Sequence, residues 1–175
     1  MNKSIILVGY MCVGKTTIGR DLAKLMNRTF YDLDWYIEER YHTKVSQIFA
    51  EKGEAHFRDL ERRMLHEVAE FENVVLSCGG GTPCFFDNID YMNQVGEVFY
   101  LKASPKTILQ HLSMSRGERP LLKDKTPEQL QQFVTEQLAQ RKPFYSKARH
   151  IVDVNVLDSF DKIKFVTQDI ANAIG

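Results

Sequence analysis

The sequence lacks an excess of charge of either sign. Lys and Arg together number 23, as do Asp and Glu, so the formal net charge is zero. A protein that binds nucleic acid through a broad basic face carries a positive surplus, which disfavours that class here. No apolar run reaches the roughly 20 residues of a membrane-spanning helix. No basic and then apolar leader opens the chain, and we expect a cytoplasmic protein without a membrane partner.

Cysteine is also scarce, with three residues at positions 12, 78 and 84. An odd number without metal-type spacing argues against a disulfide framework and indicates reduced thiols. Cys12 lies in a glycine-rich loop, where it is either a reactive thiol or a small residue that the loop tolerates. The five histidines are scattered along the chain, and we interpret them as surface or helix-packing residues rather than metal ligands.

Length and patterning indicate one domain spanning residues 1–175. Of these residues 43% are hydrophobic, which is enough for a full core. Short apolar runs alternate with segments of helical periodicity, and we see no repeat, linker or low-complexity stretch. This alternation predicts an α/β fold, a three-layer sandwich with helices on both faces of a parallel sheet. The expected strands are residues 5–8, 29–34, 74–77, 97–101 and 150–153.

The most informative stretch begins directly after the first expected strand. Gly9 and Gly14 frame four residues, and Lys15 and Thr16 follow immediately. A helix is expected to start at about Lys15, so the pattern is that of a phosphate-binding loop. Its glycines let backbone N–H groups face an anion, and the helix N-terminus adds a favourable dipole. Lys15 supplies a charge for the outer phosphates, and the Thr16 hydroxyl is a ligand for Mg²⁺.

Two acidic residues, Asp32 and Asp34, end the second expected strand. If the backbone is still extended there, both carboxylates project to the same side. One could then hold the waters of a Mg²⁺ ion while the other meets a second substrate. The alternative is that they cap the helix that follows, as acidic residues after strands often do.

Three consecutive glycines, residues 79–81, follow the third expected strand. They permit close backbone approach to a ligand, although a flexible turn is the simpler alternative. In parallel sheets, ligands bind beyond the carboxyl ends of the strands. That rule places the phosphate loop, both aspartates and the glycines along one rim, so we expect a single cleft.

Arginines supply the remaining candidates. Arg58 and Arg141 lie on two expected helices; each alone is typical of a solvated or salt-bridged side chain, but together they could clamp a carboxylate. Residues 113–125 break periodicity and form a candidate lid, in which Arg119 could neutralise a transferring phosphoryl group. For Arg116, a contact with a nucleotide base and a solvated charge both stay open.

With these motifs together, the chain resembles the shikimate kinases over nearly its whole length. The phosphate loop alone is shared by many unrelated nucleotide enzymes, whereas its combination with the triple glycine and the Arg-Pro-Leu-Leu sequence is far more specific. The residues that carry the resemblance are Gly9 to Thr17, Asp32 to Asp34, Gly53-Glu54 through Phe57-Arg58, Gly79 to Gly81, Arg119 to Leu122, and Arg141, Pro143 and Tyr145.

The resemblance implies a P-loop NTPase-type fold with about five parallel strands, a mobile lid at about 113–125 and a substrate-binding helical segment at about 34–61. It implies transfer of the γ-phosphoryl group of ATP to the 3-hydroxyl of shikimate, giving shikimate 3-phosphate and ADP in aromatic amino acid biosynthesis. Its implied residue roles are ATP binding by Cys12, Val13, Gly14, Lys15, Thr16, Thr17 and Arg119, shikimate binding by Asp34, Arg58, Gly80, Gly81 and Arg141, Mg²⁺ binding by Thr16 and, through water, Asp32, and catalysis by Lys15, Asp34 and Arg119.

Two departures from the family pattern are visible. Cys12 stands where glycine is common, and the last strand with its following loop matches poorly, so no adenine-contacting residue is named. The nearest rival is a gluconate-type sugar-acid kinase, which the arginine pair and the triple glycine disfavour. A nucleotide-controlled binding protein without catalysis is a second alternative. We expect a monomer that binds ATP or ADP and shikimate but no nucleic acid.

Overall fold

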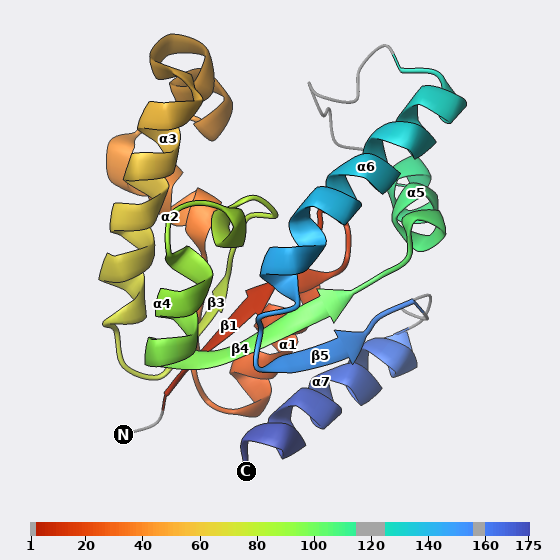
Figure 1. Cartoon of the computed structure of the whole chain (residues 1–175). Helices are drawn as coiled ribbons and strands as arrows, with labels where there is room; N and C mark the ends of the chain where they lie inside the picture. The colour runs from red at the N-terminus through yellow and green to blue at the C-terminus, as the bar shows by residue number, and fades with distance from the viewer. Residues whose placement is uncertain (1–2, 115–124, 156–159) are drawn as a thin grey trace.

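The computed structural model describes residues 3–114, 125–155 and 160–175, and its centre is a five-stranded parallel sheet (Figure 1). The strand order is β2-β3-β1-β4-β5, and every described pairing is parallel. The predicted α/β class with a parallel sheet is therefore confirmed. The strands are β1 (Ser4–Val8), β2 (Thr29–Asp32), β3 (Val74–Ser77), β4 (Gly96–Lys102) and β5 (His150–Asp153).

Helices cover both faces of this sheet because side chains alternate along each strand. From β1, Ile6 and Val8 join the core under the second to fourth helices, whereas Ile5 and Leu7 join the core under the first, fifth and last. All four are fully buried, which explains the uninterrupted apolar run. The helices are α1 (Lys15–Leu25), α2 (Leu33–Tyr41), α3 (Val45–Ala69), α4 (Asn88–Val95), α5 (Pro105–Met114), α6 (Pro127–Tyr145) and α7 (Phe160–Ile174).

Local sequence signals located several helix starts correctly. Helix α1 begins at Lys15, as the phosphate-loop pattern predicts. The Ser104 hydroxyl accepts a hydrogen bond from the Thr107 backbone N–H at the start of α5. Thr126 followed three residues later by Gln129 is the sequence pattern of a capping box, and at the start of α6 the two residues form its reciprocal hydrogen bonds.

Helical periodicity in the sequence predicts two helices, at residues 45–52 and about 53–71, and α3 is indeed broken at Gly53, whose φ of 81° is not helical. Two other boundaries differ from the expectation. The sequence pattern predicts a helix at about residues 85–93, but a short 3₁₀ turn, η1 (Thr82–Cys84), comes first and α4 starts only at Asn88, because Phe86 has a helix-breaking φ of 50°. The second strand ends at Asp32 rather than at residue 34.

The candidate lid lies almost entirely outside the described residues, and so do Arg116 and Arg119. Within the described ranges, no helix combines the length and apolar character needed to cross a bilayer. The fold therefore positions the phosphate loop, the aspartates and the glycines, but it does not test the lid.

Candidate active site

The phosphate loop connects β1 to α1 at the carboxyl edge of the sheet. Gly9 has a φ of 147°, and a Cβ atom there would lie 2.6 Å from the Leu101 carbonyl oxygen, so no larger residue fits. Gly14 is the N-cap of α1, with a φ of 91°. The Lys15 ammonium donates hydrogen bonds to the carbonyls of Gly9 (2.9 Å) and Tyr10 (2.7 Å).

Burial gives Lys15 an unusual charge balance. Desolvation lowers its pKa to about 8, although the nearby carboxylates of Asp32 and Asp34 oppose that shift. The neighbouring Val13 side chain is packed into the core, which anchors the loop, while Thr17 lies at the cavity. The pKa of the Lys15 ammonium therefore lies only slightly above neutral pH.

Asp32 caps the helix that follows it, which is one of the two alternatives that the sequence left open. Its Oδ1 accepts hydrogen bonds from the backbone N–H groups of Asp34 and Trp35, so it caps α2. Its Oδ2 lies 3.3 Å from the Thr16 hydroxyl, which donates to it. The condition of extended backbone through residue 34 is not met, because α2 begins at Leu33. A helical turn, rather than strand alternation, brings Asp34 to the same rim.

The Asp34 carboxyl is buried among charges. Burial raises its pKa to about 7, and the carboxylates of Glu61 and Asp32 add to that shift, whereas Lys15 and Arg58 oppose it. A Cβ atom built on Gly79 would lie 3.4 Å from Asp34 Oδ1, so this carboxyl rests against the triple-glycine backbone. An acid with a pKa near 7 is well suited to exchange protons at neutral pH.

The two arginines approach the next two glycines. A Cβ atom on Gly80 would lie 2.9 Å from Nη1 of Arg141, and one on Gly81 would lie 2.6 Å from Nη2 of Arg58. A side chain at either position would therefore have to displace the guanidinium group that lies there. The triple glycine is thus contacted by side chains from three helices: Asp34 of α2, Arg58 of α3 and Arg141 of α6. Its glycines have close neighbours, which a simple flexible turn would not require.

Arg141 also connects the triple glycine to the phosphate loop. Its guanidinium lies 5.3 Å from the centre of the Tyr10 ring, within the loop. Tyr145, one turn further along α6, donates its hydroxyl to the Gly80 carbonyl. The two halves of the rim are therefore adjacent, as the single-cleft expectation requires.

Glu61 is a site residue that was not predicted from the sequence. It is only 1% exposed; its Oε2 lies 2.9 Å from Nη1 of Arg58, and its Oε1 accepts a hydrogen bond from the Thr82 hydroxyl at 2.6 Å. Arg58 lies over the Phe85 ring at 4.1 Å, which fixes its plane further. The available signal was a carboxylate set among the apolar side chains of one helix face, Phe57, Leu60, Met64 and Val68.

A cavity of about 400 Å³ opens where these groups converge. It is lined by Met11, Cys12, Gly14, Lys15, Thr16, Thr17, Asp32, Asp34, Ser77, Cys78, Gly79 and Gly80. Of the residues predicted for the site, Cys12, residues 14–17, both aspartates and Gly80 line this cavity, whereas the Val13 side chain is packed in the core. Arg58, Gly81 and Arg141 adjoin it through the glycines, and Arg119 lies outside the described residues.

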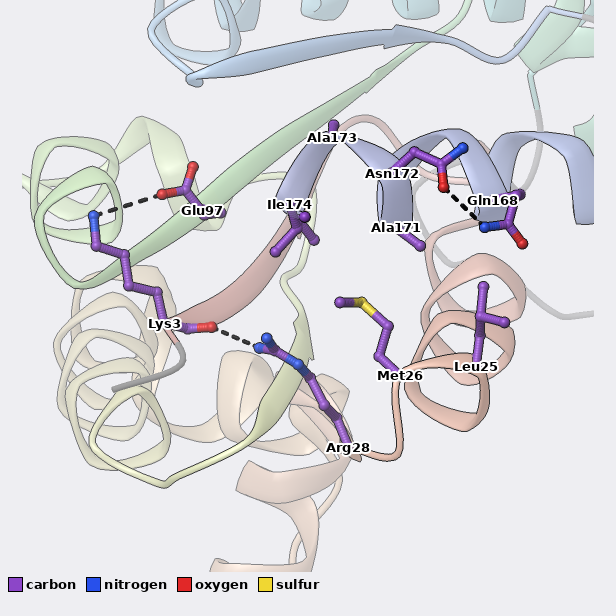
Figure 2. A pocket seen from close by; sticks show the side chains of 11 residues that line it. Lys3, Leu25, Met26, Arg28, Glu97, Gln168, Ala171, Asn172, Ala173 and Ile174 are labelled. Atoms are coloured by element: carbon purple, nitrogen blue, oxygen red, sulfur yellow. Dashed lines mark hydrogen bonds and ion pairs between the residues drawn. The ribbon is translucent and has the colours of Figure 1, made fainter.

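A larger cavity, of about 860 Å³, lies at the opposite edge of the sheet (Figure 2). There the Arg28 guanidinium donates to the Lys3 carbonyl at 2.6 Å, and the Lys3 ammonium lies 3.5 Å from the Glu97 carboxylate. Lys3 and Glu97 thus form an ion pair, and the Arg28 guanidinium has a main-chain acceptor. Volume alone would therefore point to the wrong edge, and we place the active site at the phosphate loop.

Comparisons with known proteins agree with this geometry. The family model described as shikimate kinase matches residues 11–173. The shikimate kinase of Parabacteroides distasonis is 51% identical over 176 residues, covering 98% of this chain and 97% of that protein. A crystal structure of shikimate kinase from Bacteroides thetaiotaomicron has a TM-score of 0.95 at 45% identity and 98% coverage of both chains. Shikimate kinase from Acinetobacter baumannii, in complex with shikimate, has a TM-score of 0.85 at 33% identity, covering 99% of this chain and 95% of that one.

Replacement of Asp34 by Asn should stabilise the protein in a pH-dependent way. The folded-state pKa of about 7 exceeds the ordinary 3.8, so the unfolded chain loses this proton first as the pH rises. Stability therefore falls between these two values, and the loss is complete above pH 7. We expect Asp34→Asn to raise the free energy of unfolding by on the order of 1–3 kcal/mol at pH 8 and by much less at pH 4.5.

Urea unfolding at both pH values measures this effect. Asp59→Asn, on α3, is the matched control, because the Asp59 side chain is 62% exposed and should change stability by less than about 0.5 kcal/mol. Equal stabilisation by Asp34→Asn at the two pH values would contradict the assignment of a raised pKa.

Proposed function

Because the chain belongs to the shikimate kinase family, it is an ATP-dependent kinase, and we propose that it phosphorylates the 3-hydroxyl of shikimate to give shikimate 3-phosphate and ADP. The observation that carries this proposal is the junction of a phosphate loop with two arginines at the triple glycine. The loop suits a triphosphate, and paired guanidinium groups suit a carboxylate. This reaction belongs to aromatic amino acid biosynthesis.

The phosphates of ATP would bind to the backbone N–H groups of residues 12–17. Lys15 would move its ammonium from the loop carbonyls to the outer phosphates, where it meets stronger acceptors. Arg119, whose position is not described, would add a second cation there. The backbone donors of the loop are fixed before the reaction, so they require little reorganisation as charge develops.

Magnesium fits the oxygen donors at the loop. Thr16 Oγ1 and Asp32 Oδ2 are 3.3 Å apart at the cavity, and such oxygens suit a hard cation. Within the described ranges, no group of three or more acidic, histidine or cysteine side chains could hold a metal on its own. Thr16 would therefore bind Mg²⁺ directly and Asp32 through water. When bound, the ion neutralises charge on the phosphate oxygens.

Shikimate would lie on the other side of the same rim. Arg58 and Arg141 would bind its carboxylate, and the backbone of Gly80 and Gly81 would approach its ring. Glu61 would act as a positioning residue, because it holds Nη1 of Arg58 while the aromatic ring of Phe85 lies over the guanidinium. The planar guanidinium is thus oriented before substrate binds.

Asp34 would orient the attacking hydroxyl and accept its proton. Phosphoryl transfer passes through a loose transition state in which positioning and cations supply most of the catalysis. The proton leaves the hydroxyl oxygen late, and the ionised Asp34 carboxylate, which becomes a carboxylic acid with a pKa of about 7, can take it at neutral pH. All the residues assigned here come from one chain, and we propose that the kinase acts as a cytoplasmic monomer.

Substrate-dependent release of ADP tests the proposed reaction. Purified protein with ATP and Mg²⁺ should release ADP rapidly when shikimate is added, and at least about a hundredfold more slowly with gluconate, which lacks the rigid ring that the paired arginines would orient. Equal rates with the two acids would favour the sugar-acid kinase. Binding of ADP without any shikimate-dependent turnover would indicate a protein that has lost catalysis.

The rate at low concentrations of both substrates should depend on pH as a bell-shaped curve. It should rise through about pH 7 as Asp34 ionises and fall through about pH 8 as Lys15 loses its proton. Lys15→Arg, whatever its overall rate, should lose the alkaline fall, because a guanidinium stays charged throughout. A rate that is constant from pH 6 to pH 9 in the unmodified protein would contradict both assignments.

Substitution of Arg58 by Lys should weaken shikimate binding selectively. Lysine keeps the charge but loses the planar pair of donors, so we expect KM for shikimate to rise about tenfold or more and KM for ATP to change little. Arg62→Lys, one turn along α3 and paired with Asp87, is the matched control and should change neither constant. An unchanged KM for shikimate in Arg58→Lys would remove the carboxylate clamp.

A further inference from the structure

The His111 side chain contacts the phosphate loop from α5. Its Nδ1 lies 2.9 Å from the carbonyl oxygen of Cys12, although the two residues are 99 positions apart. A carbonyl oxygen only accepts hydrogen bonds, so Nδ1 carries the proton and donates it. The expectation of a simple surface or helix-packing histidine is wrong at this position, because the ring binds the main chain of the site.

Cys12 has a backbone conformation that disfavours cysteine. Its φ is 60°, in the left-handed region, which glycine adopts without steric cost and asparagine at a modest cost. In any other residue the Cβ atom crowds the carbonyl oxygen that follows it. This explains why glycine is common at the position, and the crowded carbonyl is the one that accepts the hydrogen bond from His111.

The orientation of this carbonyl determines the direction of a loop donor. The described peptide bonds are all trans, so the Cys12 carbonyl and the Val13 N–H point in opposite directions from one planar unit. With the carbonyl held toward His111, the Val13 N–H is held away from it. Two other loop carbonyls, those of Gly9 and Tyr10, likewise accept hydrogen bonds from a side chain, that of Lys15.

We propose that His111 is a positioning residue of the phosphate loop, which holds the Cys12–Val13 peptide in its left-handed arrangement and thereby offsets the presence of a non-glycine residue at position 12. The hydrogen bond keeps the Val13 N–H directed toward the phosphates. This inference rests on the proposed function, because it assigns the loop to a nucleotide.

Substitutions of His111 that keep or remove the donor test this role. Asparagine places an amide N–H close to the position of Nδ1, whereas glutamine places it near Nε2 and leucine has no donor. Binding of ADP with Mg²⁺, measured by calorimetry, should weaken about three- to tenfold in His111→Leu and His111→Gln. It should weaken less than about twofold in His111→Asn, and shikimate affinity should be unchanged in all three.

A double-mutant cycle with position 12 separates this role from helix packing. In a Cys12→Gly background, glycine adopts the left-handed conformation without support, so His111→Leu should weaken ADP binding by less than about twofold. Cys12→Ala is the matched control: it removes the thiol but keeps a Cβ atom, so it should stay fully sensitive to His111→Leu.

An equal loss from His111→Leu in the unmodified protein and in the Cys12→Gly variant would overturn the proposal, as would an equal loss in His111→Asn and His111→Leu. If His111→Leu does not fold, the comparison of His111→Asn with His111→Gln makes the same test. Failure of the proposed function is distinguishable, because the unmodified protein would then bind no ADP or show no shikimate-dependent turnover.

Discussion

The guanidinium groups of Arg58 and Arg141 lie so close to the main chain of Gly80 and Gly81 that a side chain at either glycine would displace them. Most of the site depends on this contact. It allows groups from α2, α3 and α6 to converge on one strand end, and it keeps the peptide groups accessible to a ligand. A Cβ atom at Gly81 would displace the guanidinium of Arg58, which in turn is held by Glu61.

Burial of charged side chains at this site shifts their pKa values. Burial raises the pKa of Asp34 and lowers that of Lys15, so each group is moved toward its neutral form. Burial also raises the pKa of Glu61, although direct bonds to Arg58 and Thr82 oppose that shift. Those bonds suit Glu61 to positioning, whereas Asp34 lies at the cavity and is available for chemistry.

Features encoded by neighbouring residues were predictable. The strand, loop and helix around Lys15 lie within one short stretch, and the capping box of Thr126 and Gln129 spans a single turn. Predictions that needed the exact end of an element were less accurate: Asp34 reaches the rim from a helix, and α4 starts later than expected because of the backbone at Phe86. Sequence alternation and periodicity do not specify where a single residue, such as Phe86, adopts a positive φ and interrupts a helix.

Glu61 and His111 were not identified as site residues, since nothing adjacent to them in the sequence marks what they contact. Glu61 binds Thr82, 21 positions away, and His111 binds Cys12, 99 positions away. Such contacts depend on which face of a helix is turned inward, and the packing of α3 and α5 on the sheet decides that.

The sequence by itself determined the phosphate loop, the parallel α/β architecture and the family, because those depend on local spacing and on short periodic patterns. Only the tertiary structure decided that two arginines, an aspartate and a buried glutamate meet at three glycines, and that a histidine supports a cysteine in a glycine conformation. Burial and distance between remote residues control those features, and neither is defined until the helices are packed.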